Sequence, residues 1–176
     1  MKQVLAVFGW LLILAVQVAL WPQVTDGLQP AFALAAALAI GLAPSATVTG
    51  PARARVGASG NLWRGFWLAV ISGTVLGLYA QHHFGLLAAA SALGYASIWL
   101  VIRPPIDDLG WPGRLSAAVL AAAIYELTIL IVLKLTVANF PFLAELTTIG
   151  TLNVLGTVTA FALFTGLFGA YRRRTA

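Results

Sequence analysis

An uninterrupted apolar run from Leu115 to Val137 constrains this chain more than any other feature of its sequence. The run can cross the hydrocarbon core of a bilayer as one helix, because such a span takes about 20 residues. One carboxylate, Glu126, lies near its middle. A charged Glu in hydrocarbon costs several kcal/mol, so this side chain must be neutral, paired, or turned toward protein or water. We expect the neighbouring segments to supply that environment.

The composition indicates a membrane protein. Hydrophobic residues make up 61% of the chain and charged residues 9%, whereas a soluble domain of this size needs a far more polar surface. The net charge of +5 does not indicate nucleic-acid binding, because the basic residues lie at the ends of apolar segments. The absence of cysteine excludes disulfides, thiolate metal sites and cysteine nucleophiles.

Six apolar segments are expected to form transmembrane helices in one domain that covers the whole chain. Their approximate bounds are residues 3–21, 30–43, 62–80, 84–102, 115–137 and 148–171. The second segment opens at Pro30, which suits the first turn of a helix. The stretch from Pro44 to Asn61 is rich in Gly, Ser, Thr and Pro and is expected to be a polar connection. The first segment is interpreted as a retained helix rather than a cleaved signal peptide, since no convincing cleavage site precedes Trp21.

Basic residues concentrate on one side of this expected membrane domain, because they lie at the termini and on every second connection. One side carries Lys2, Arg53, Arg55, Arg64, Arg103, Arg114, Arg172, Arg173 and Arg174. The other side has only Lys134, at the end of the fifth segment. Because basic residues concentrate on the cytoplasmic side of membrane proteins, both termini are expected in the cytoplasm. An all-α fold with six transmembrane helices satisfies this requirement for an even number of spans.

Small residues at four-residue spacing indicate close contacts between helices. Gly73 and Gly77 form one such pair, and Gly94 follows Ala90 at the same spacing. Glycine lets two helix backbones approach closely, so these positions are interpreted as sites of helix packing or partner contact. Packing inside the bundle is the favoured reading, because such patterns are common in membrane helices.

Glu126 is expected to have a polar partner on another helix. Asn153 in the last segment and Gln17 in the first are polar groups inside apolar runs, and either could hydrogen-bond to the carboxyl group. Lys134 is too far along the same helix, since the two residues differ by roughly 12 Å of rise. Structural hydrogen bonding, ligand or proton handling, and contact with a partner helix all remain open for Glu126.

No pattern indicates a catalytic, cofactor or metal site. His82 and His83 are adjacent, so on a helix they point in different directions, and they are interpreted as part of an interfacial turn. Asp107 and Asp108 lie in a loop with Pro and Gly and without a third ligand nearby. The tryptophans lie mostly near the ends of apolar segments, where they are expected to anchor the chain at the membrane interface.

Several local patterns resemble the rod-shape-determining membrane protein family MreD. The segment from Gly65 to Leu78, with Ser72 and Gly73 inside it, is similar to a Gly-Phe…Ser-Gly stretch of that family. The helix opening at Pro30 is also similar, and so is the last segment, which has Asn153 near its start and a basic tail at its end. The run from Leu86 to Tyr95 resembles the small-residue helix that follows in the family.

This resemblance implies a non-catalytic scaffold of the bacterial cell-elongation (peptidoglycan synthesis) complex, located in the cytoplasmic (inner) membrane. Its implied partners are membrane lipids, an MreC-like protein, a RodA-type polymerase and a class B penicillin-binding protein. The implied fold is similar to that of the substrate-binding subunits of energy-coupling-factor vitamin transporters. A subunit of such a transporter, or another small membrane transport protein, is therefore the alternative expectation. A membrane protein of another kind is a further alternative, and a membrane enzyme is the least favoured one.

Overall fold

A computed structural model of the chain describes residues 2–20, 31–43, 51–79, 85–101 and 110–175. Every regular element in these ranges is a helix, which confirms the all-α fold class. The elements in chain order are α1 (Lys2–Ala15), η1 (Val16–Leu20), α3 (Phe32–Gly41), α4 (Pro51–Tyr79), α5 (Leu86–Val101), α6 (Trp111–Thr136), α7 (Phe142–Glu145), η3 (Leu146–Gly150) and α8 (Thr151–Thr175). Here η1 and η3 are single π-helical turns.

Two helical stretches are long and apolar enough to cross a bilayer by length and composition. They are Trp111–Thr136, and the stretch Phe142–Phe168 that runs through α7, η3 and α8. Three further apolar helical stretches among the described residues are shorter: Gly9–Val18, Phe32–Gly41 and Leu86–Trp99. These features support a membrane protein, with α6 and α8 as the helices best suited to a full crossing.

Helix α4 begins earlier than the sequence indicated. Residues 51–61, expected to belong to a polar connection, form the first turns of this 29-residue helix. Pro51 is its first residue, a position that proline favours because its fixed φ suits the helix and its missing N–H needs no partner there. The alanines and arginines that follow are strong helix formers, and extending an existing helix needs no new nucleus. The prediction of a connection reaching Asn61 was therefore wrong.

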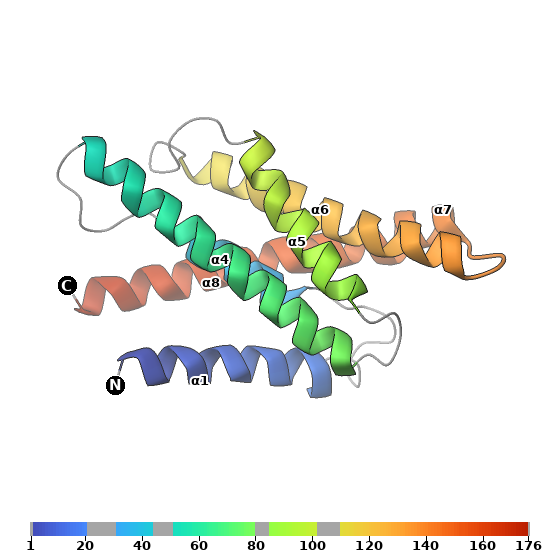
Figure 1. Ribbon diagram of the computed structural model, residues 1–176, viewed down its shortest axis with the longest axis horizontal. Helices are drawn as coiled ribbons and strands as arrows, with labels where there is room; N and C mark the ends of the chain where they lie inside the picture. The colour runs from blue at the N-terminus through green and yellow to red at the C-terminus, as the bar shows by residue number, and fades with distance from the viewer. Residues whose placement is uncertain (1, 21–30, 44–50, 80–84, 102–109, 176) are drawn as a thin grey trace.

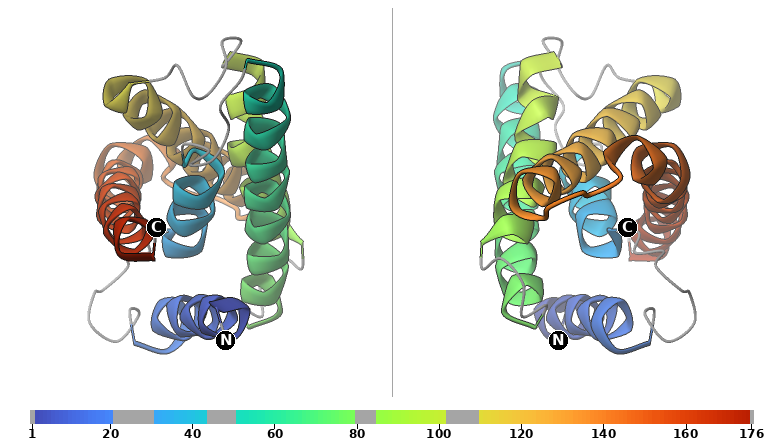
Figure 2. Two further views of the ribbon diagram at one scale, coloured as in Figure 1. Left: turned by 90° about the vertical axis from the view of Figure 1, so that its left-hand side faces the viewer. Right: turned by 90° about the vertical axis from the view of Figure 1, so that its right-hand side faces the viewer.

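Helix α3 lies in the middle of the bundle (Figure 2). It packs mainly against α4 and α8, and it also contacts α1, α5 and α6. Residues 33–39 and Gly41 are buried, and the segment consists largely of alanine and leucine. A helix that is apolar on every side is typical of a core element, because none of its faces needs contact with solvent.

The helix ends fall into two groups along the long axis of the molecule (Figure 1). The start of α1, the start of α4 and the end of α8 lie at one end. At the opposite end, the last turns of α6 and the short helix α7 project beyond α1, α4 and α5. The helix ends that bear most of the basic residues therefore share one end of the bundle, and Lys134 lies at the other.

Candidate functional site

A hydrogen bond between side chains joins Glu126 of α6 to Asn153 of α8. Both residues are buried, with exposed fractions of 5% and 6%. The two helices pack against each other along this contact. Of the two partners that the sequence offered for the carboxyl group, the structure therefore gives Asn153 this role.

Gln17 lies in a different contact, at the start of α3. Its Oε1 accepts a hydrogen bond from the backbone N–H of Ala33 at 2.9 Å. The N–H of Ala31 donates to Thr157 Oγ1, also at 2.9 Å, and the Thr157 hydroxyl in turn donates to the Asn153 carbonyl at 2.8 Å. The first N–H groups of a helix have no partner within it, so these two side chains satisfy the buried start of α3.

These contacts form a polar chain that crosses the core from Glu126 through Asn153 and Thr157 to the start of α3. Each of these residues is hydrogen-bonded either to a residue on another helix or to one a turn away on the same helix. This arrangement suits a structural connection between α6, α8 and α3. No group of three or more His, Cys, Asp or Glu side chains that could hold a metal ion occurs among the described residues.

The three glycines singled out in the sequence differ in their surroundings. A Cβ on Gly73 would lie 2.5 Å from the Leu87 carbonyl oxygen, and one on Gly94 would lie 2.7 Å from the Ala121 carbonyl oxygen. Gly73 therefore lies where α4 meets α5, and Gly94 where α5 meets α6. Around Gly77 the nearest such atom would be 3.8 Å away, so this glycine is not required by close packing.

Sequence reasoning missed Tyr95, which is fully buried in α5. Its hydroxyl group occupies the space that side chains on Gly41 of α3 and Gly65 of α4 would need. The hydroxyl oxygen has no hydrogen-bond partner among the described residues. Two glycines on separate helices carry no signal that they face one tyrosine, so only the packing reveals this contact.

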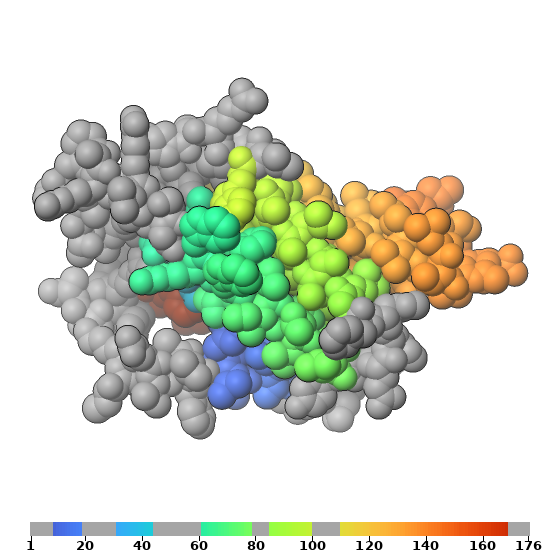
Figure 3. Space-filling model, in the orientation of Figure 1, coloured from blue at the N-terminus to red at the C-terminus, as the bar shows by residue number. Residues whose placement is uncertain are grey.

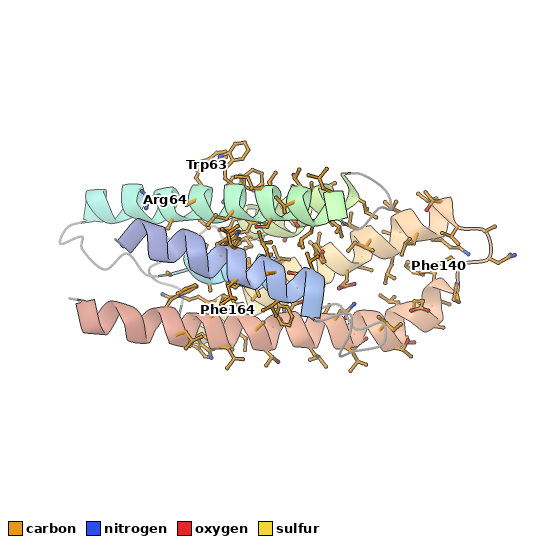
Figure 4. The ribbon with its side chains drawn as sticks, turned by 90° about the horizontal axis from the view of Figure 1, so that it is seen from below. Trp63, Arg64, Phe140 and Phe164 are labelled. Atoms are coloured by element: carbon orange, nitrogen blue, oxygen red, sulfur yellow. The ribbon has the colours of Figure 1, made fainter. Side chains whose placement is uncertain are left out.

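Aromatic side chains gather where α4 packs against α5, two helices that lie on the face seen in Figure 3. The rings of Trp63 and Trp99 are 4.8 Å apart, and those of Phe66 and Trp99 are 5.3 Å apart. Trp67 stacks on Trp63 at 6.5 Å. The three tryptophans are exposed, and Trp63 points away from the bundle in Figure 4. The neighbouring Arg64 is also exposed, as expected near a membrane interface.

The second feature that the sequence did not indicate is a projecting α6–α7 hairpin, formed by residues 131–145. Leu135 is 80% exposed and Leu143 is 74% exposed. An open cavity of about 630 Å³ lies between the two arms, lined by Ile131, Lys134, Leu135 and residues 141–144. Its lining is apolar except for Lys134. Figure 3 shows this hairpin standing clear of α4 and α5.

The backbone conformation of Asn139 and a hydrogen bond from the Lys134 side chain stabilise the hairpin turn. Asn139 has a φ of 62°, a left-handed conformation that asparagine adopts more readily than most residues. The Lys134 ammonium donates to the Phe140 carbonyl oxygen at 3.3 Å. Phe140 lies at the far end of the molecule from the chain ends in Figure 4. An ammonium has three N–H donors, so this contact leaves Lys134 able to bind a further acceptor.

Several residues considered in the sequence lie outside the described residues. They are Trp21, Pro30, His82, His83, Arg103, Asp107 and Asp108. Comparison of the chain with protein-family models, curated proteins and solved structures finds no match.

Proposed function

We propose that this protein is a non-catalytic membrane scaffold of the bacterial cell-elongation complex, and that it acts by holding partner proteins in the cytoplasmic membrane. The observation that carries this proposal is the α6–α7 hairpin, which projects from the bundle with Leu135 and Leu143 largely exposed. Exposed apolar side chains on a projecting element mark a surface for protein contact. The resemblance to the MreD family supplies the cell-elongation context.

The internal packing supports this role. The alanine-rich helix α3 fills the centre of the bundle. At its start, the backbone N–H groups of Ala31 and Ala33 donate to the side chains of Thr157 and Gln17. A well-packed core gives a rigid body whose outer surfaces keep fixed positions relative to one another. A scaffold needs that property more than it needs an internal cavity.

Six transmembrane helices with both termini in the cytoplasm are part of the proposal. The clustering of the starts of α1 and α4 with the end of α8 supports it, because these ends carry the basic residues that favour the cytoplasmic side. In this orientation the α6–α7 hairpin faces the outside of the cell, where peptidoglycan is assembled.

Depletion of the protein from a rod-shaped bacterium that encodes it tests the proposal. Cells should become round while their membrane protein synthesis continues, and expression of the intact chain should restore the rod shape. Cells that keep their rod shape and cell-wall synthesis rate after complete depletion would show that the scaffold role is wrong.

The cavity at the hairpin favours a second candidate, a small-molecule capture subunit of a transporter. Its volume of about 630 Å³ is in the range of ligand pockets, and Lys134 could bind an anionic group. The purified protein would then retain a vitamin-sized ligand, detectable by mass spectrometry after denaturation. Depletion would lower uptake of that ligand and leave cell shape unchanged.

A further inference from the structure

We infer that the α6–α7 hairpin binds an apolar segment of a partner protein that carries a carboxylate opposite Lys134, just outside the hydrocarbon core. This inference deepens the proposed function by naming the surface and the chemistry of its partner. It rests on three observations: the depth of the hairpin, the shape and lining of its cavity, and the charge at its edge.

The depth follows from the charged residues of α6 and α8. Along α6, the rise from Arg114 to Lys134 is about 30 Å, which matches the thickness of a hydrocarbon core. The hydrogen bond between Glu126 and Asn153 sets the two antiparallel helices in register. In that register Glu145 comes at about the same height as Lys134, so both charged groups mark one boundary.

The rest of the hairpin therefore lies among the lipid headgroups or beyond them. Leu135, Val137 and Leu143 are exposed there, although a polar environment disfavours them. Acyl chains of lipids run from the headgroups toward the bilayer centre, so they do not fill an apolar cavity on the outer side of the boundary. A protein segment can enter it from outside the membrane.

The positive charge of Lys134 favours partner segments that carry an acidic residue. Lys134 is exposed at the edge of the cavity. Among the described residues, its side-chain ammonium makes one hydrogen bond, to the Phe140 carbonyl oxygen. An apolar cavity with an ammonium at its rim is complementary to apolar side chains flanked by Asp or Glu. A charge pair between the two proteins would be partly desolvated, which strengthens it and makes binding sensitive to reversal of either charge.

Photo-crosslinking in native membranes tests this inference. Benzoylphenylalanine is placed at position 143 of the full chain, and at position 155 as the matched control. Leu155 is 58% exposed against 74% for Leu143, but it lies on α8 about 15 Å of helix rise from Glu145, at mid-membrane depth. We expect a discrete protein adduct from position 143 only, with a crosslinked peptide that combines apolar residues and an acidic residue.

Charge changes then decide whether the adduct reports the proposed contact. Lys134→Glu should reduce adduct yield by about tenfold or more, Lys134→Arg should preserve it, and changing the acidic residue of the identified peptide to lysine should restore it in the Lys134→Glu background. Equal lipid adducts at both positions, or a protein adduct that is insensitive to Lys134→Glu, would overturn the inference.

These outcomes are separate from the test of the proposed function. If depleted cells become round but Lys134→Glu fully restores their shape and leaves the adduct unchanged, the docking inference fails and the scaffold role stands. If depletion leaves cell shape unchanged while the charge-dependent adduct persists, the docking surface stands and the role in cell elongation fails.

Discussion

The backbone N–H of Ala31 donates a hydrogen bond to Thr157 Oγ1 at 2.9 Å, which ties the start of α3 to the second turn of α8. The two residues are 126 positions apart in the chain, and both are buried. A short helix in the core of a membrane bundle has no water to satisfy its first N–H groups. This contact therefore fixes where the central helix begins.

Replacing Thr157 by valine should lower the free energy of unfolding by about 1–3 kcal/mol. The variant keeps the shape of the side chain but leaves the Ala31 N–H without this acceptor, and an unsatisfied buried donor is costly. Thermal unfolding of the purified protein measures the change. The matched control is Thr159→Val, because Thr159 is exposed and bonds only within its own helix, to the Leu155 carbonyl oxygen. Equal losses from both variants would contradict the assignment.

Gly73 and Gly77 of α4 should respond differently to alanine. Gly73→Ala places a methyl group 2.5 Å from the Leu87 carbonyl oxygen and should destabilise the protein by about 1–3 kcal/mol through overpacking. Gly77→Ala has room for the methyl group and should be neutral or stabilising by up to about 1 kcal/mol, since alanine favours the helix. Thermal unfolding of both variants provides the measurement. A stable Gly73→Ala protein would show that α4 and α5 can move apart at no cost.

Glu126 should tolerate glutamine better than leucine. Glutamine is neutral and can still hydrogen-bond to Asn153, so we expect a change in unfolding free energy of no more than about 1 kcal/mol. Leucine removes the hydrogen bond to Asn153 and should cost about 1–3 kcal/mol. Both variants are compared by thermal unfolding and by their ability to restore cell shape. Unchanged stability with lost activity in Glu126→Gln would show that the charge itself is functional.

Tyr95→Phe should leave stability unchanged or raise it by about 1 kcal/mol. The phenylalanine ring preserves the packing between α3 and α4, while it removes a buried hydroxyl that has no partner among the described residues. Thermal unfolding again reports the result, with Tyr95→Leu as the control that removes the ring. A marked loss of stability in Tyr95→Phe would show that the hydroxyl makes an interaction that matters.

Labelling of intact cells should report the orientation of the chain. The protein has no cysteine, so a single introduced cysteine is a unique target. A membrane-impermeant thiol reagent should modify Asn139→Cys at the hairpin and leave Arg55→Cys unmodified until the cells are opened. A reporter that is active only outside the cytosol should also be silent when fused after Arg174. Labelling of position 55 on intact cells would reverse the proposed topology.

The sequence predicted the helical fold more reliably than the helix ends. Apolar runs led to helices in all six expected regions, because burial of backbone polar groups in an apolar setting leaves few alternatives to a helix. The start of α4 at Pro51 was missed, since a polar, glycine-containing stretch can continue a helix once an apolar segment has formed it. The start of α6 at Trp111 likewise precedes the expected Leu115.

The candidate sites were predicted in part. A polar partner for Glu126 was expected because a carboxyl group in hydrocarbon needs one, and Asn153 was one of the two named. The role of Gln17 at Ala33 and the position of Tyr95 beside Gly41 were not foreseen. Each depends on which helices meet and at what height, which no local pattern specifies.

By itself, the sequence determined that this chain is helical, that it is rich in apolar segments, and that its basic residues lie at the ends of alternate segments. These properties depend on how favourably each residue moves from water into an apolar environment, which its own side chain decides. Only the tertiary structure decided that α3 fills the centre, that Glu126 meets Asn153, and that residues 131–145 project as a hairpin. Those facts depend on packing between distant segments, where the fit of side chains and the pairing of buried polar groups select one arrangement among many of similar hydropathy.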